Sequence, residues 1–443
     1  MRKHIIRIAT LAAAAGLAAS AADLLTLDQA VAIAVDQNRS LRNSALEVEK
    51  AQDSVAANRT RQFPSFSLNV LGAQQLQPFD FTIQKGQLGN YQGTGPLPGE
   101  DVHFKSPMEP TGLLVGKVSQ PLTSLIRIRR GLETLKTTAE IAREQSRADR
   151  QKTVRDVKRA YYGIQQLESS LRSVRQTRDL YAELEKLTEN YVAGQVVLKS
   201  ELLDIQANLA KTEQTTLELE DQTASGKEQL NQLLGRDVLI DFEVQPALEI
   251  TDDETTLEAA RGQALNRRPE VHQAQLRAKQ AEQDLRAKRA EYIPDVSADF
   301  SSYSLLNFGQ FLPTQTSSVG INVSWEPFDW GRKKHEIAGK QRTIEEARNA
   351  EKDTVNAVLM DVNDKYRQLR RSQAQLRVAR LSQEAAMEGL RVMKNKYAVK
   401  AALLKDVLQG QVGLEQSNSD YQQALVSFWN ARADFERALG EDQ

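Results

Sequence analysis

The stretch Thr26-Leu27-Asp28-Gln29-Ala30 decides the fold, because the chain carries it twice. Its echo is Thr256-Leu257-Glu258-Ala259-Ala260, and the two copies stay aligned without a gap as far as Phe63-Pro64 and Ile293-Pro294. An insertion in the first copy, between Pro64 and Pro121, then shifts the alignment. Self-similarity at a fixed spacing is the signature of repeated structural units. The chain therefore predicts two internal repeats of one plan.

Short alternating segments follow the proline in each repeat. A period of two between apolar and polar residues indicates a strand with one apolar and one polar face. We expect four strands, at about 65–72, 112–120, 295–304 and 317–326. Aromatic residues gather in and beside these segments, which is typical of the girdles of a membrane β-barrel. A sheet packed on a soluble core is the alternative, although no apolar layer elsewhere in the sequence is suited to cover it.

Very long helices are predicted after the strands. The segments from about 125 to 191 and from about 331 to 397 contain no proline. At a rise of 1.5 Å per residue, each would reach about 100 Å, far more than an ordinary globular helix. Apolar residues in the first recur at spacings of three and four, which is the pattern of a coiled-coil seam. A short break and a return helix follow each segment, so each repeat predicts a long helical hairpin attached to a strand pair.

The amino terminus predicts export. Arg2, Lys3 and Arg7 precede an apolar run that closes on Ala19-Ser20-Ala21, the order of features in a cleavable signal peptide. No later stretch approaches the roughly 20 apolar residues of a membrane-spanning helix. The expected organisation is a mainly α chain with a small β part, divided into four segments. These are a signal peptide at 1–21, a first repeat at 22–235, an inter-repeat linker at 236–255 and a second repeat at 256–443.

Composition excludes several classes of function. The 443 residues include no cysteine and four histidines. This removes disulfides, thiolate metal sites, a cysteine nucleophile and lipid attachment through an N-terminal cysteine. The net charge of −1 argues against a nucleic-acid partner. No catalytic motif has the required spacing. We therefore expect no enzyme activity, no cofactor, no metal site and no nucleic-acid binding.

Four strands are too few for a membrane barrel. An open sheet edge would leave N–H and C=O groups without partners in hydrocarbon. The smallest membrane barrels have about eight strands, so strands from other chains must complete the ring. Symmetric closure implies a homo-oligomer. Three copies would supply twelve strands, and two copies would also reach the minimum.

Several motifs, in the same order in both repeats, carry a resemblance to a known family. They are Leu25-Thr26-Leu27-Asp28-Gln29-Ala30-Val31, Phe63-Pro64-Ser65, Ile293-Pro294-Asp295, Pro327-Phe328-Asp329-Trp330-Gly331, Tyr397-Ala398-Val399 and Asp406-Val407-Leu408. From Leu25 to Gly440 the chain resembles the TolC-like outer membrane efflux protein family, the outer membrane factors. The resemblance implies a homotrimer with a twelve-stranded transmembrane β-barrel among the outer-membrane lipids. Long coiled-coil helical hairpins would form a trimeric α-barrel that continues it through the periplasm, and the linker at 236–255 would lie in the equatorial region.

The resemblance also implies a function and its partners. Such a chain would be the channel-tunnel component of a tripartite efflux or type I secretion system. It would act as a passive, gated exit duct that docks to a periplasmic adaptor protein and an inner-membrane pump. The alternative is a periplasmic coiled-coil adaptor or structural protein, because such proteins also carry a long helical hairpin. Adaptors, however, normally carry one such hairpin rather than two related halves with amphipathic strand pairs.

The family's gate lies where the long helices turn at the periplasmic tip. By resemblance, Asp406 falls on the first position of a pore ring and Gln409 on the second, where relatives often carry a carboxylate. Tyr397, Ser200 and Glu201 match positions of the latch that holds the gate shut. This sequence departs from the family by placing Lys400 and Ala402 at two neighbouring positions, in place of a glycine and a basic residue. Two plainer interpretations stay open: Asp406 as a solvated acid on a helix surface, and Tyr397 as a packing residue that continues the seam of Leu390 and Met393.

The insertion is rich in turn-forming residues. Its part from about 77 to 111 contains clustered glycine and proline, which is typical of a surface loop. Barrels of this kind place their long loops outside the cell. We expect an extracellular loop here, and its role stays open between a lid, a phage receptor and no function.

Overall fold

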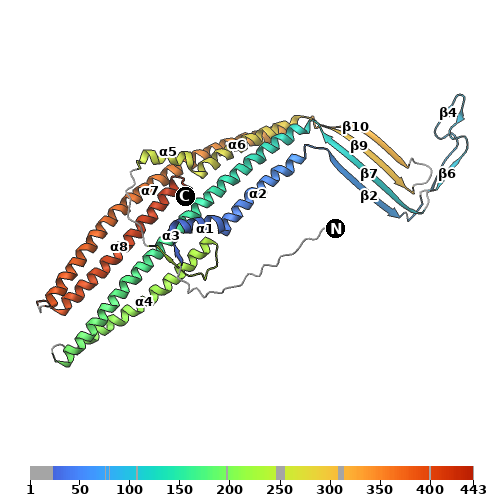
Figure 1. Cartoon of the computed structure of the whole chain (residues 1–443). Helices are drawn as coiled ribbons and strands as arrows, with labels where there is room; N and C mark the ends of the chain where they lie inside the picture. Colours follow the sequence, from blue (N-terminus) through green and yellow to red (C-terminus); the bar gives the residue numbers. More distant parts are fainter. Residues whose placement is uncertain are drawn as a thin grey trace, which may run out of the picture. The chain divides into compact units, whose positions relative to one another are not determined.

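A computed structural model of the chain describes residues 23–74, 76–78, 80–105, 108–195, 198–245, 255–307, 314–398 and 401–442 (Figure 1). The chain is mainly helical, at 69%, with a small sheet part, so the predicted fold class is confirmed at that level. The expected signal peptide at 1–21 lies outside the described residues. In the described ranges, no helix is both long enough and apolar enough to cross a membrane.

The chain divides into two compact units, and each takes segments from both sequence repeats. Unit 1 comprises 1–43, 147–269 and 356–443, and unit 2 comprises 44–146 and 270–355. Two long helices run through both units: α3 spans Ser124–Ala193 and α7 spans Arg332–Ala398.

Unit 2 contains a four-stranded antiparallel sheet. Its strands are β2 (Ser65–Gln74), β7 (Pro110–Pro121), β9 (Asp295–Leu306) and β10 (Gln315–Ser324). Their order is β10-β9-β7-β2, so β2 and β10 are the two edges. Because β2 and β9 run one way while β7 and β10 run the other, the two edge strands are antiparallel to each other.

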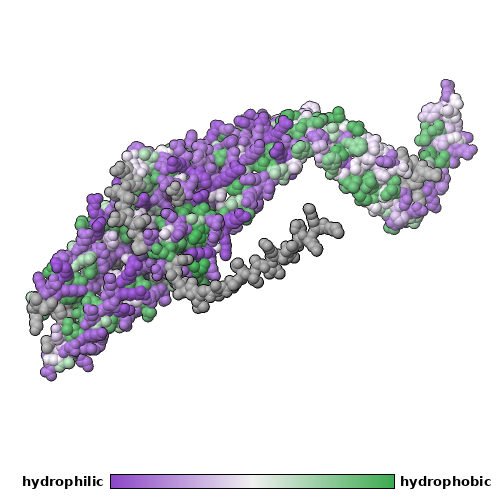
Figure 2. All heavy atoms as spheres, viewed as in Figure 1, coloured by the Kyte–Doolittle hydropathy of each residue, from purple (hydrophilic) through white to green (hydrophobic). Residues whose placement is uncertain are grey.

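Strand register sorts the side chains into two unlike faces. Phe66 lies opposite Val118, Val118 opposite Phe300, and Phe300 opposite Val319, so apolar side chains run in a row across all four strands. The edge members of this row are largely exposed, Phe66 at 78% and Val319 at 82%. Figure 2 shows hydrophobic residues gathered over these strands. The other face carries polar groups, including an ion pair of 3.4 Å between Lys117 Nζ and Asp299 Oδ2.

The insertion is more ordered than a plain surface loop. It forms two short antiparallel ribbons, β3 (Asp80–Ile83) with β6 (Val102–Lys105) and β4 (Asn90–Tyr91) with β5 (Gly95–Pro96). The prediction of a loop was incomplete because the glycines serve the turns of a hairpin rather than an irregular segment. Four of them, Gly86, Gly89, Gly93 and Gly95, have the positive φ that such turns favour.

Four helices pack side by side within unit 2. They are α2 (Arg39–Thr60, from Ser44 onward), the first part of α3, α6 (Pro269–Arg289) and the first part of α7, and the short η1 (Ala290–Tyr292) follows α6. Ser44 and Ser146 join α2 to α3, Gln280 and Thr138 join α6 to α3, and Glu282 and Arg348 join α6 to α7. The order is therefore α2-α3-α6-α7.

Unit 1 is built from helical hairpins. Besides the later parts of α3 and α7, it contains α1 (Leu27–Gln37), α4 (Lys199–Leu234), α5 (Leu257–Arg267) and α8 (Leu404–Ala438). Ion pairs and hydrogen bonds link neighbours in the order α4-α3-α8-α7, which Figure 1 also shows. A parallel pair, β1 (Asp23–Leu25) with β8 (Phe242–Val244), lies beside them.

Tyr161 ties the small β pair to α3. Its hydroxyl donates to the Leu25 carbonyl at 2.8 Å and accepts from the Gln245 N–H at 3.0 Å. Burial raises the pKa of Tyr161, which keeps the hydroxyl neutral and able to donate. The buried core continues through Val157 and Ile164 on the same helix. The backbone ends of the strand pair thus have partners inside the unit.

Both repeats begin with a short capped helix that stops at a matching break. The Thr26 side chain accepts from the Gln29 N–H, and the Thr256 side chain accepts from the Ala259 N–H. Each helix ends after eleven residues, at the caps Asn38 and Arg268. Asn38 then starts α2, because its side-chain oxygen accepts from the N–H groups of the next turn.

A glycine that ends a long helix packs against each of these two breaks, and we call this arrangement a glycine lock. Gly235 ends α4 with a φ of 78°, and Gly440 follows α8 with a φ of 80°. The N–H groups of Arg236 and Glu441 donate to carbonyls five residues back, which is the Schellman arrangement. The Asn38 amide donates to the Leu233 carbonyl at 2.6 Å, and the Arg268 guanidinium donates to the Ala438 carbonyl at 3.4 Å. Corresponding positions of the two repeats thus perform the same connection.

Candidate pore gate at the hairpin turns

Asp406 lies in the first turn of α8, directly after the turn from α7. Its Oδ2 accepts from the Leu403 N–H at 3.0 Å, and the Asp406 N–H donates to the Leu403 carbonyl at 3.0 Å. A carboxylate is favourable here because the free N–H groups of a helix N-terminus carry partial positive charge. The side chain is exposed. Asp406 is therefore a helix cap at the tip, a role that the sequence interpretation did not include.

Gln409 lies one turn further along α8 and is also exposed. Asp406 and Gln409 line the same groove, of about 510 Å³, between the ends of α7 and α8. Small residues on both helices, including Gly389 and Gly410, make room for it. The two predicted ring residues thus share one surface.

The other hairpin turn has the same local design. Glu201 lies in the first turn of α4, and its N–H donates to the carbonyl of the cap residue Leu198 at 3.1 Å. A leucine cap and an acid at the third helical position therefore begin both return helices. Glu201, rather than Ser200, is the structural counterpart of Asp406. Ser200 is exposed and Glu201 is half-buried.

The described side chains of the two hairpin turns make no latch contact within one copy. Across the described part of the chain, neither Ser200 nor Glu201 makes a hydrogen bond or ion pair with Asp406 or Gln409. Tyr397 lies in the last turn of α7, and its side chain lies outside the described residues. A latch between Ser200 or Glu201 and Asp406 or Gln409 would therefore have to join different copies or form in a different state.

An apolar cluster positions the first turns of α8 against α3 and α4. Tyr181 and Leu184 of α3 and Ile205 of α4 are buried together, and Leu408 of α8 packs against them. Val407 is also buried. Because adjacent helix positions point about 100° apart, Asp406 and Gln409 are left on the exposed side.

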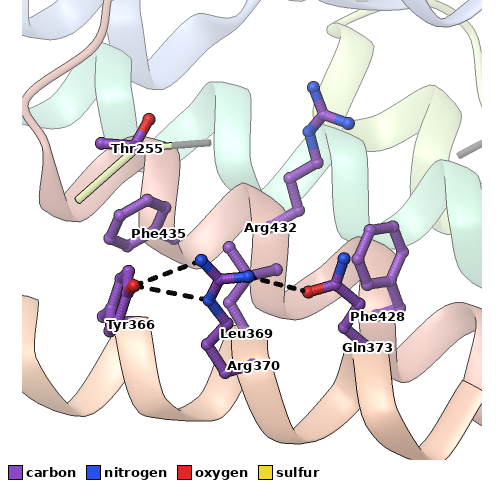
Figure 3. A pocket seen from close by; sticks show the side chains of 8 residues that line it. All are labelled: Thr255, Tyr366, Leu369, Arg370, Gln373, Phe428, Arg432 and Phe435. Atoms are coloured by element: carbon purple, nitrogen blue, oxygen red, sulfur yellow. Dashed lines mark hydrogen bonds between the residues drawn. The ribbon is translucent and has the colours of Figure 1, made fainter. Parts of the chain in front are cut away.

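A second hollow lies between α7 and α8, farther from their connecting turn, and its lining offers no catalytic pair. Figure 3 shows Tyr366 and Arg370 of α7 facing Phe428 and Phe435 of α8. The Arg370 guanidinium donates to the Tyr366 hydroxyl at 3.3 and 3.4 Å (Figure 3). A nucleophile needs an adjacent base, and this arginine is not one. In the described ranges, no group of three or more histidine, aspartate or glutamate residues is placed to hold a metal ion.

Comparison with known proteins settles the family. The model of the outer membrane efflux protein family matches residues 30–236 and 260–441, which include both hairpin turns. The chain belongs to the outer membrane efflux protein family. The resemblance predicted from the sequence is therefore confirmed, and this family is one of efflux proteins rather than enzymes. No curated protein sequence matches this efflux protein.

Solved channels share the fold of this efflux protein. VceC of Vibrio cholerae is 17% identical, with a TM-score of 0.73 over 94% of this chain and 96% of that one. CmeC of Campylobacter jejuni is 13% identical, with a TM-score of 0.76 over 99% and 94%. The open state of MtrE of Neisseria gonorrhoeae is 16% identical, with a TM-score of 0.71 over 94% and 89%. At these identities the likeness concerns the fold.

Proposed function

We propose that three copies of this chain form the outer-membrane channel-tunnel of a tripartite efflux or type I secretion system. The duct is passive and gated, and a periplasmic adaptor and an inner-membrane pump dock to it. The observation that carries the proposal is the sheet of unit 2, which has one apolar face and two open edges. Family membership and the likeness to solved outer-membrane channels support the same function.

The two edge strands of the sheet are antiparallel to each other, so copies of the chain can join edge to edge into a closed barrel. Strand β10 of one copy can pair with β2 of the next, because the two edges run in opposite directions. Every junction in such a ring is antiparallel, as in outer-membrane barrels. Three copies of four strands give twelve, and the outward apolar row containing Phe66 and Val319 would meet lipid. Lys117 and Asp299 would line the wet interior.

The repeats and helices account for the rest of the duct. The matched caps, breaks and glycine locks support two structural repeats, at 22–235 and 256–443, joined by an equatorial linker at 236–255. The helices of three copies would continue the barrel as a coiled-coil tunnel through the periplasm. An export signal at 1–21 fits this location.

We place the gate at the hairpin turns. Three copies of Asp406, with Gln409 one turn away, would form a ring on the symmetry axis and concentrate negative potential there. Among the described side chains of one copy, Ser200 and Glu201 make no hydrogen bond or ion pair with Asp406 or Gln409. Tyr397, Ser200 and Glu201 would therefore act as a latch between copies in the closed state. Asp406 is exposed, whereas Leu408 two residues later packs into the apolar cluster.

Single-channel recording tests both the channel and the ring. Protein reconstituted in planar bilayers should conduct, and divalent cations added on the tunnel side should block the current. Asp406→Asn should weaken that block about tenfold or more, since a rate or binding factor of ten needs only about 1.4 kcal/mol. Asp420→Asn, an exposed acid further along α8, should leave it unchanged. Absence of conductance would overturn the channel, and equal block in both variants would overturn the ring.

A further inference from the structure

The four junctions between strands and helices in unit 2 lie at one end of its sheet. Ser65, which begins β2, lies opposite Ser119 near the end of β7, and Ser119 lies opposite Asp299 of β9. Asp295, which begins β9, lies opposite Ser324, which ends β10. The connections to α2, α3, α6 and α7 therefore leave the sheet at the same level. We call this level the junction collar, and it comprises 59–65, 119–130, 286–296 and 324–334.

Large aromatic side chains are exposed in the collar. Trp330 is 89% exposed and Phe328 is 68% exposed, while Phe63, Tyr292 and Trp325 are each more than half exposed. All five lie in segments that connect a strand to a helix, at three of the four junctions. Tryptophan and tyrosine favour the boundary between hydrocarbon and water, because their rings have an apolar body and a polar edge. The collar therefore has the side chains of a bilayer interface.

A built turn holds Trp330 in its exposed position. Trp330 and Gly331 both have left-handed backbones, with φ of 55° and 83°. A bulky side chain rarely adopts this conformation. The Asp329 carboxylate stabilises the turn by accepting from the N–H groups of Gly331 at 3.0 Å and Lys333 at 2.9 Å. The Phe328 ring lies edge-on to Trp330, with 4.8 Å between centroids. The fold thus maintains a strained turn that leaves a tryptophan uncovered, which indicates a partner outside the chain.

Exposed cations accompany the aromatic residues. Some cations of the collar are neutralised within unit 2, since Arg127 pairs with Asp295 at 2.8 Å and Lys288 pairs with Glu336 at 2.7 Å. Six others are exposed and form no ion pair with any described residue: Arg59, Arg61, Arg129, Arg286, Arg289 and Lys334. They lie in or next to α2, α3, α6 and α7, so every junction contributes. The collar therefore keeps accessible positive charge that the chain itself does not balance.

We infer that the junction collar binds anionic phospholipids of the leaflet that faces the periplasm. The exposed cations contact the headgroup phosphates, and the aromatic side chains lie at the level of the lipid ester groups. The inference rests on the proposed membrane barrel and adds to it the lipid class and the residues that select it. Its occupant is lipid rather than protein, because the collar continues the apolar row of the sheet that would meet hydrocarbon.

The order of side chains along the chain supports this placement. The apolar row of the strands comes first, then the aromatic residues, then the cations of the helices. A membrane leaflet presents hydrocarbon, ester groups and phosphates in the same order. Anionic lipids attract Lys and Arg side chains near the membrane surface more strongly than zwitterionic lipids do. The accessible positive charge therefore selects an anionic headgroup.

Lipid retention by the assembled protein tests the headgroup site. Protein extracted in detergent would be incubated with equimolar phosphatidylglycerol and phosphatidylcholine, and the lipids retained by the particle would be identified by native mass spectrometry. The unmodified protein should prefer phosphatidylglycerol. The triple variant Arg61→Gln, Arg289→Gln and Lys334→Gln should lower this preference about tenfold or more. The matched control removes the same three charges from exposed positions of α7 in unit 1 and should keep the preference: Arg371→Gln, Arg377→Gln and Lys394→Gln.

Quenching by brominated phospholipids tests the aromatic part of the collar. The chain contains three tryptophans, Trp325, Trp330 and Trp429. In vesicles, lipids brominated near the headgroup end of the acyl chain should quench the fluorescence of the protein. Trp330→Phe should remove a large part of this quenching. Trp429→Phe is the matched control and should retain it, because Trp429 is buried in unit 1.

The failures are distinguishable when the native mass is read from the same spectra. Trimers without a preference for phosphatidylglycerol, or an equal loss in both triple variants, would overturn the headgroup site and leave the proposed channel standing. Quenching that does not change in Trp330→Phe would overturn the position of the collar at the interface. Monomers, or protein absent from the membrane fraction, would contradict the proposed function itself.

Discussion

Gly235→Ala is expected to prevent accumulation of the folded protein or to lower its stability severely. A Cβ at this position would lie 2.2 Å from the Gln37 carbonyl oxygen and 3.1 Å from the Asn38 Cα. The backbone must also hold a φ of 78°, which costs a non-glycine residue roughly 1–2 kcal/mol. Relief of the overlap requires a backbone shift at the break between α1 and α2, and overpacking of this kind typically adds about 1–3 kcal/mol. We therefore expect a total loss of about 2–5 kcal/mol.

Two measurements test this: the thermal unfolding midpoint, monitored by far-ultraviolet circular dichroism, and the yield of protein in the membrane fraction. Gly440→Ala should behave similarly, because its Cβ would lie 2.8 Å from the Arg267 carbonyl carbon. Gly262→Ala is the matched control: it lies inside α5, and a Cβ there meets nothing within 4 Å. Alanine is the better helix former, so this change should be neutral or slightly stabilising. Equal behaviour of Gly235→Ala and the control would contradict the lock.

Arg159→Met is expected to destabilise unit 1 by about 3 kcal/mol. The Asp434 carboxylate is 5% exposed and pairs with Arg159 Nη2 at 2.6 Å, while Lys365 Nζ lies 3.7 Å away. These three residues join α3, α8 and α7. Removing one partner of a buried pair leaves a charge without its main compensation, which typically costs 3–5 kcal/mol. The lower end is expected because Lys365 remains and Arg159 itself is partly solvated.

Arg178→Met on the same helix is the matched control for this pair. Its partner Asp179 is 66% exposed, and an exposed ion pair contributes little to stability because water screens it. Urea unfolding of both variants, monitored by circular dichroism, should separate them by midpoint. The double variant Arg159→Met with Asp434→Leu should recover part of the loss, because no buried charge is then left. If the double variant recovered no stability, packing rather than the buried charge would account for the loss in Arg159→Met.

The sequence predicted the elements that repeat over long stretches. Alternation around Phe66 and Val319 indicated strands, and the proline-free segments indicated the long helices now seen as α3 and α7. These signals are local and strong because one face of each element is apolar throughout. The motifs spread over both repeats also identified the family, which the family match confirms.

Structural features that depend on tertiary contacts could not be predicted from the sequence. The packing of Gly235 and Gly440 against the helix breaks at Asn38 and Arg268 joins residues 197 and 172 positions apart in the chain. The hairpin within the insertion was hidden by its glycines, which indicate turns without giving strand pairing. At the gate, Asp406 and Gln409 line one groove, and the capping role of Asp406 required the turn geometry. A leucine followed by an acid three residues later, at Leu198 and Leu403, was the available signal.

The central claim is that the four-stranded sheet closes only with other copies, three in all. The most direct measurement is the native mass of the detergent-extracted outer-membrane protein, with detergent accounted for, by mass spectrometry or light scattering. The account predicts three chains per particle and twelve strands per ring. A monomer, or a particle recovered only from the soluble periplasmic fraction, would contradict it.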